Sequence, residues 1–221
     1  MVRPAPSSAF YRPLDHVLGS GALVRVARVL ASHGGSLGVS DIARRAKLTL
    51  PSTRDALRRL RDSGMVTGVG AGRSMVYALR MNHPLARPLV ALYAAEREQA
   101  DAVLDIIRTA AAALRPAPLG VWLYGSVARN EDHPGSDIDV AIATADRDPT
   151  PQADALREAI TAAAPQHAHR VSVVAIGPAD VSRLAGEGAG FWRDLERDAV
   201  VLAGDAPAGV LERLEQPRRM A

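Results

Sequence analysis

The sequence contains no cysteine, a single lysine and no long hydrophobic run. Without cysteine the chain forms no disulfide and offers no thiolate ligand to a metal ion. No apolar stretch approaches the ~18 residues of a membrane-spanning helix, and the opening "MVRPAPSSAF" lacks the continuous apolar segment of a secretory signal. We therefore expect a cytoplasmic protein with no membrane partner.

Charge is distributed unevenly along the 221 residues, of which 48% are hydrophobic and can build a core. Residues 1–95 carry 14 Lys or Arg and 4 Asp or Glu, whereas residues 96–221 carry 13 and 20. A basic half followed by an acidic half indicates two domains with different partners. The basic half is the candidate for contact with phosphate backbones.

The basic half has the pattern of three helices. Apolar residues recur at helical spacing over residues 14–32. Ser40 is a good N-cap for a second helix over residues 41–46. Pro51 suits the first turn of a third helix, "PSTRDALRRLRDSG", which Gly64 ends.

Two short extended runs follow, "MVTGV" and "SMVYAL", joined by the glycine-rich "GAGR". They predict a hairpin with a basic tip. Three helices and such a hairpin resemble the winged helix-turn-helix of bacterial repressors over about residues 14–80. The resemblance implies that the second helix of the pair enters the major groove of DNA and that the hairpin touches its backbone or minor groove. The residues that it places against DNA are Ser52, Thr53, Arg54, Arg58, Arg59 and, in the wing, Arg73.

Other interpretations of the basic half stay open. A small helical domain with solvated arginines has the same composition, and winged helices also serve as protein-interaction modules. The next segment reads as one long helix from Pro88 to Leu114, polar in its middle. Such a helix needs a partner face, so we expect a homodimer.

The acidic half alternates strand-like and helix-like runs and predicts a small α/β domain with a mixed sheet. Its clearest feature is "GSVARNEDHPGSDIDVAI". Residues two apart on a strand share a face, so Asp137 and Asp139 project together and repel unless a cation or a divalent metal holds them. Gly125 lets the backbone approach a ligand, and Ser126 begins a short helix whose free amides favour a phosphate.

This motif resembles the Gly-Ser … Asp-x-Asp signature of the polymerase-β-like nucleotidyltransferases, especially their minimal bacterial members. The resemblance covers about residues 119–203. It implies that Gly125 and Ser126 bind the triphosphate of an NTP and that Asp137 and Asp139 bind Mg²⁺ and are catalytic. Arg129, one turn after Ser126, adds a phosphate contact or is a surface arginine.

One position departs from that family. Its active members place a third carboxylate on the next long strand, which here reads "HRVSVVAI", with Ser172 at the matching position. A serine neither binds magnesium with full charge nor acts as a base near neutral pH. Asp180 and Glu187 lie past the strand and are poor substitutes.

The sequence thus predicts an α+β multidomain chain. Its parts are a flexible leader (1–13), a winged helix-turn-helix (14–82), a bridging helix (83–118), a nucleotidyltransferase-like domain (119–205) and a C-terminal tail (206–221).

Two functions follow from these parts. The first is Mg²⁺-dependent transfer of a nucleoside monophosphate from an NTP to a hydroxyl acceptor, with DNA binding for targeting or autoregulation. The second is a DNA-binding transcriptional regulator whose degenerate transferase domain senses a nucleotide or holds a partner, with a toxin–antitoxin role as an analogy.

Overall fold

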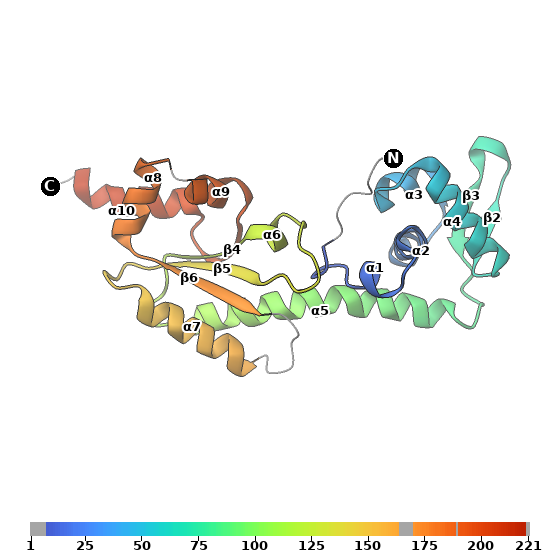
Figure 1. Ribbon diagram of the computed structural model, residues 1–221. Helices are drawn as coiled ribbons and strands as arrows, with labels where there is room; N and C mark the ends of the chain where they lie inside the picture. Colours follow the sequence, from blue (N-terminus) through green and yellow to red (C-terminus); the bar gives the residue numbers. More distant parts are fainter. Residues whose placement is uncertain (1–7, 164–169, 189, 220–221) are drawn as a thin grey trace. The chain divides into compact units, whose positions relative to one another are not determined.

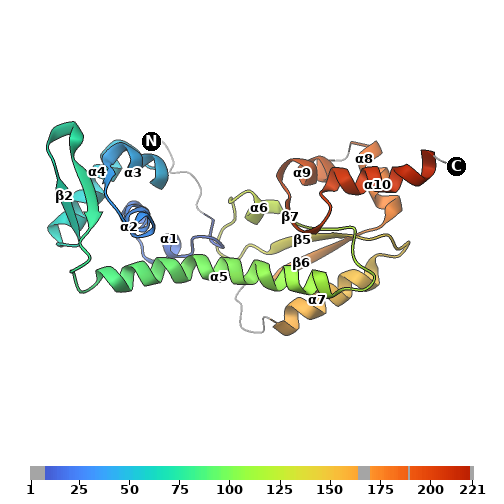
Figure 2. The same ribbon diagram turned by 180° about the vertical axis from the view of Figure 1, so that it is seen from behind.

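The computed structural model describes residues 8–163, 170–188 and 190–219 (Figures 1 and 2). The chain forms two compact units, Met1–Gln99 and Ala100–Ala221. The boundary lies within a continuous helix, α5 (Ala86–Ala113), at the place where the sequence predicts a bridging helix. The two units are described separately below.

From residue 8 onward, four helices precede the hairpin of the first unit: α1 (Leu14–Val17), α2 (Gly21–His33), α3 (Val39–Ala46) and α4 (Leu50–Asp62). The sequence predicts one helix over residues 14–32, but the chain breaks at Gly19, whose φ is +80°. That left-handed conformation favours glycine and ends a helix.

The ends of α3 and α4 follow capping chemistry in part. The predicted cap at Ser40 is wrong, because α3 begins at Val39 after Gly38 and has no side-chain cap. At α4, Thr49 Oγ1 accepts a hydrogen bond from the Ser52 backbone amide at 3.4 Å. Gly64, with φ +77°, follows the end of α4 as predicted.

The predicted hairpin is present. It consists of β2 (Val66–Val69) and β3 (Val76–Leu79), whose connection contains a 3₁₀ turn, η1 (Gly72–Ser74). A short strand, β1 (Leu37–Gly38), adds to β3, so the antiparallel sheet has the order β1-β3-β2.

The core of this unit joins α2, α3 and α4 to the sheet and to the first part of α5. Tyr93 of α5 is buried there, and its hydroxyl donates a hydrogen bond to the carbonyl oxygen of Val24 at 3.0 Å. Ser8, Ala9 and Phe10 are also buried, although the sequence places them in a flexible leader. Their burial places residues 8–10 in the folded unit.

The second unit contains a mixed four-stranded sheet with the order β6-β5-β4-β7. Strands β5 and β6 are parallel, and the other two pairings are antiparallel. The strand bounds are β4 (Gly120–Tyr124), β5 (Ile138–Ala143), β6 (Val171–Ile176) and β7 (Val200–Gly204).

Helices cover both faces of this sheet (Figures 1 and 2). The last part of α5 and α7 (Thr150–Ala163) lie on one face. The other face carries α8 (Pro178–Gly186), α9 (Gly190–Asp198) and α10 (Pro207–Arg219). The sequence analysis assigns residues 206–221 to a tail, whereas α10 places Val210, which is fully buried, in the core.

Two tryptophans form the centre of the core beneath α8, α9 and α10. The rings of Trp122 and Trp192 meet edge to face with centroids 6.2 Å apart. The indole nitrogen of Trp122 donates a hydrogen bond to the carbonyl oxygen of Asp205 at 2.8 Å. This bond ties the middle of β4 to the chain that enters α10.

Candidate functional site

The candidate site lies where β4 ends and β5 begins. Tyr124, the last residue of β4, pairs with Asp139 in the antiparallel register of the two strands. The chain then turns directly into a short helix, α6 (Gly125–Ala128), with Ser126 in its single turn. The turn therefore brings the Gly-Ser pair beside the carboxylates that follow it by a dozen residues.

Gly125 lies against the carboxylate of Asp139. A Cβ atom at position 125 would be 2.4 Å from Asp139 Oδ2, closer than atoms approach without displacement. The φ of Gly125 is +75°, a conformation that other residues rarely adopt. Both observations require glycine here, so the backbone and the carboxylate share one narrow space.

The two aspartates face the same side of the sheet. Ile138, Val140 and Ile142 are fully buried, while Asp137 and Asp139 are half-buried, as the alternation predicts. Burial raises the pKa of Asp139, and the charge of Asp137 raises it further. The pair is therefore short of positive charge, and a cation would relieve the repulsion.

Arg129 supplies part of that charge. It follows α6 directly, and its guanidinium lowers the pKa of Asp139 against the two effects above. Its Nε also lies 2.9 Å from Glu131 Oε2 in a partly exposed ion pair. Arg129 is thus close enough to stabilise the charged form of Asp139, but it also forms an ion pair with Glu131.

Ser172 occupies the position beside Asp139 on the neighbouring strand. The parallel register of β5 and β6 pairs these two residues directly. Asp180 lies in α8, where its Oδ2 accepts a hydrogen bond from the Gly177 amide at 3.2 Å, so it caps a helix. Of the described residues, no group of three or more His, Cys, Asp or Glu could hold a metal ion.

The donors present still suit magnesium in their chemistry. Mg²⁺ binds one or two carboxylates together with substrate phosphates and water, and needs no all-protein cage. Two adjacent carboxylates with a repulsion to relieve, beside a half-buried Gly-Ser turn, meet that description. Asp137 and Asp139 are the residues that would hold the ion.

Tyr124 lies beside this site, a placement that was not predicted from the sequence, and it contacts Phe191, which packs against the core beneath α8, α9 and α10. Their rings meet edge to face with centroids 5.4 Å apart. Burial raises the pKa of Tyr124, and so does the charge of Asp139. The available signal was that Tyr124 stands immediately before Gly125. The last residue of a strand must lie next to the turn that follows it, so Tyr124 had to be a neighbour of the Gly-Ser turn.

The basic surface of the first unit lies on α4. Arg54, Arg58 and Arg59 are exposed, and Ser52 is half-buried. Arg58 forms an exposed ion pair with Asp55. Thr53 is a correction: it is fully buried, and its hydroxyl donates to the Thr49 carbonyl oxygen at 2.9 Å, so it does not face a partner.

Arg73 lies in η1, within the connection between β2 and β3. This position is the tip of the hairpin, where the sequence analysis expects a basic residue. In the described parts of the chain, no helix is both long and apolar enough to cross a membrane.

Comparison with known families adds one finding. Residues 104–189 match the family model of a nucleotidyltransferase domain. The matched range contains the Gly-Ser turn, both aspartates and Ser172. Searches of curated proteins and of solved structures each gave no significant match.

Proposed function

We propose that the C-terminal unit transfers a nucleoside monophosphate from an NTP to a hydroxyl group. The observation that carries this proposal is the contact between Gly125 and the Asp139 carboxylate, within the range that matches a nucleotidyltransferase domain. The acceptor oxygen attacks the α-phosphorus and forms a new P–O bond. The bond from that phosphorus to its bridging oxygen breaks, and pyrophosphate leaves.

Each residue has a separate task in this proposal. The turn at Gly125 and Ser126 binds the triphosphate, and Arg129 adds a charged contact to it. Asp137 and Asp139 would hold Mg²⁺, which would supply positive charge against the charge that develops on the phosphates. Ser172 cannot take the proton of the acceptor near neutral pH, so that proton passes to solvent.

Calorimetry with ATP, GTP, CTP and UTP, with and without Mg²⁺, tests the binding step. At least one NTP should bind, and only with the metal. Asp137→Asn should abolish that binding, while Asp154→Asn, which changes an exposed acid on α7, should not. Equal binding by the parent and Asp137→Asn would contradict the proposed site. Incubation with labelled NTPs, Mg²⁺ and host lysate then identifies the acceptor.

We also propose that residues 14–82 form a winged helix-turn-helix that binds DNA. The support is the pair α3 and α4, followed by a hairpin that pairs with β1, together with the exposed arginines of α4. An exposed Arg-rich helix next to such a hairpin matches the docking of this motif in the major groove.

Ser172 favours a second function. Since the residue opposite Asp139 is not a carboxylate, the C-terminal unit could bind a nucleotide without transferring it. The protein would then be a DNA-binding regulator that senses the nucleotide. Tight, Mg²⁺-dependent NTP binding without labelled product would support this function over the enzyme.

A further inference from the structure

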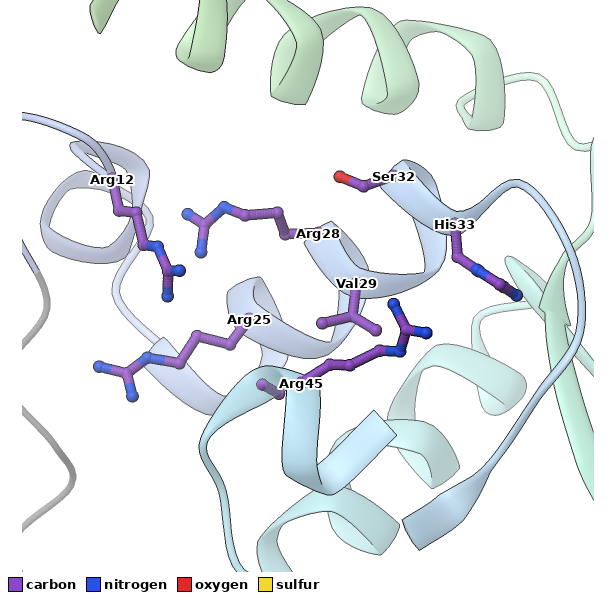
Figure 3. A pocket seen from close by; sticks show the side chains of 8 residues that line it. Arg12, Arg25, Arg28, Val29, Ser32, His33 and Arg45 are labelled. Atoms are coloured by element: carbon purple, nitrogen blue, oxygen red, sulfur yellow. The ribbon is translucent and has the colours of Figure 1, made fainter. Parts of the chain in front are cut away.

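A cavity of about 250 Å³ lies in the N-terminal unit (Figure 3). Helices α2 and α3 and the segment before α1 contribute its walls. Four of its lining residues are arginines, and the described residues contribute no carboxylate to the lining. The full lining is Arg12, Arg25, Arg28, Val29, Ser32, His33, Arg45 and Ala46.

Two of the arginines are held by buried acids that do not line the cavity. Arg25 Nε lies 3.2 Å from Asp15 Oδ2, and Arg28 Nη2 lies 2.7 Å from Asp15 Oδ1. Arg28 Nε lies 2.6 Å from Glu96 Oε2. The side chains of both acids are only 3% exposed. This network fixes the two guanidinium groups in place.

Arg28 is the most constrained of the four. Its guanidinium carbon lies 5.3 Å from the centre of the Tyr93 ring. Burial alone would lower the pKa of Arg28, but hydrogen bonds to Glu96 and Asp15 raise it above its ordinary value. Arg28 therefore stays charged in its half-buried position.

The other two arginines are less fully balanced: the nearby Asp41 carboxylate, which Arg44 also pairs with, interacts with Arg45 only through its charge. Arg25 and Arg28 are balanced by Asp15 and Glu96, whereas neither Arg12 nor Arg45 forms a salt bridge with any described residue. Ser32 and His33 add hydrogen-bonding groups to the lining. Like charges around a partly enclosed space repel, and a bound anion would remove that repulsion.

We propose that this cavity binds a small phosphate-class anion, such as inorganic phosphate, pyrophosphate or the phosphate end of a small metabolite. Guanidinium groups match phosphate oxygens through paired N–H donors. The volume lies just below the ~300–1,000 Å³ of sites for drug-sized molecules, which suits a compact anion. The proposal is independent of the transferase function.

Binding would act on the rest of the unit. The anion would join α2 to α3 through Arg28 and Arg45. Both helices pack against α4, the helix proposed to read DNA. Occupancy of the cavity would therefore stabilise the arrangement of these three helices.

Calorimetry of the full chain with pyrophosphate in EDTA tests the proposal, because the chelator removes the metal on which the carboxylate site depends. The parent should bind, and Arg45→Ala should bind about tenfold more weakly, since a charge-assisted contact is lost. Arg44→Ala is the matched control: Arg44 is the preceding residue of α3, is exposed, pairs with Asp41 and does not line the cavity.

Arg12→Ala should repeat the effect of Arg45→Ala from the opposite wall. No binding by the parent, or equal affinity of the Arg45→Ala and Arg44→Ala proteins, would overturn the proposal. Titration with a DNA duplex distinguishes a site for a small phosphate anion from a site for the DNA backbone. If Arg45→Ala weakens duplex binding as much as pyrophosphate binding, the cavity belongs to the DNA surface and the small-anion site is refuted.

Discussion

Asp139 of β5 and Ser172 of β6 lie directly opposite each other in the parallel pairing of the two strands. The pairing places a hydroxyl where a carboxylate would complete a set of three with Asp137 and Asp139. The electrostatics of the site therefore depend on two acids, and the repulsion between them already raises the pKa of Asp139 beyond the effect of its burial.

Ser172→Asp adds a third carboxylate beside Asp139. Without metal, the added repulsion should lower the Tm, and Mg²⁺ should restore it. If two carboxylates suffice for transfer, turnover should not exceed that of the parent. Val174→Asp, two residues further on the same strand and partly exposed, should show no metal-dependent recovery. A large gain in turnover by Ser172→Asp would instead support the regulator with a degenerate site.

Asp139→Asn should alter how stability depends on pH. The folded-state pKa of Asp139 lies above its ordinary value of 3.8. This group therefore favours the folded state below about pH 3.8, and that contribution is lost as the pH rises through the raised pKa. In EDTA the Asn variant should melt a few degrees higher than the parent at neutral pH, and the gain should vanish in acid. Asp105→Asn, which changes an exposed acid, should show no such gain; a gain that persists in acid would contradict the assignment.

Gly125→Ala should damage both the site and the fold. The new Cβ would displace the Asp139 carboxylate, so Mg²⁺-dependent NTP affinity should fall at least tenfold, or about 1.4 kcal/mol. The left-handed φ alone should destabilise the fold by about 1–2 kcal/mol. Gly19→Ala is the control for strain, because Gly19 has φ +80° and no atom near its added Cβ. It should lose stability without losing NTP affinity.

Local patterns were enough to predict much of the fold. The alternation around Asp137 and Asp139 correctly predicts the burial of Ile138, Val140 and Ile142, but Ala141 and Ala143 on the other face are buried as well, because helices cover both faces of the sheet. The glycine after α4 and the hairpin are also as predicted. The break at Gly19 was missed because apolar spacing continues across it, and only the backbone conformation reveals the interruption.

Sites that depend on contacts between residues far apart in the sequence could not be predicted. The Gly125–Asp139 contact follows from a motif, whereas the arginine cavity depends on Glu96, 68 residues after Arg28. Arg25 and Arg28 interrupt an otherwise apolar helix, which was the one local signal of a buried charged network. The resemblance places Thr53 against DNA, but Thr53 lies on the buried face of α4 together with Ala56, Leu57 and Leu60.

Replacing Arg58 and Arg59 by Ala should weaken binding to duplex DNA. Each arginine that reads a base contributes about 1–3 kcal/mol, and affinity should fall with salt through counterion release. Arg108→Ala is the control, because Arg108 is exposed and pairs with Asp105 three residues earlier, as Arg58 pairs with Asp55. Gel shifts that show no binding at low salt would identify the unit as a protein-interaction module.

The expected homodimer can be tested through exposed leucines. Leu85 and Leu92, seven residues apart, are 58% and 40% exposed. Light scattering should give twice the 23.3 kDa of the chain at tens of micromolar, and Leu92→Glu should shift it to the monomer mass. Val17→Glu, at a position that is 74% exposed, should leave the mass unchanged. A parent protein that scatters as a monomer would refute the dimer.

The edge-to-face pair of Trp122 and Trp192 gives the molecule an internal optical label. Both tryptophans of the chain lie in the second unit, buried in one core. Indole emission during heating or denaturant titration therefore follows residues 100–221, while circular dichroism follows the helices of both units. If the fluorescence and circular dichroism transitions have different midpoints, each unit melts on its own. A ligand could then be assigned to one unit, because it would shift the midpoint of only that unit's transition.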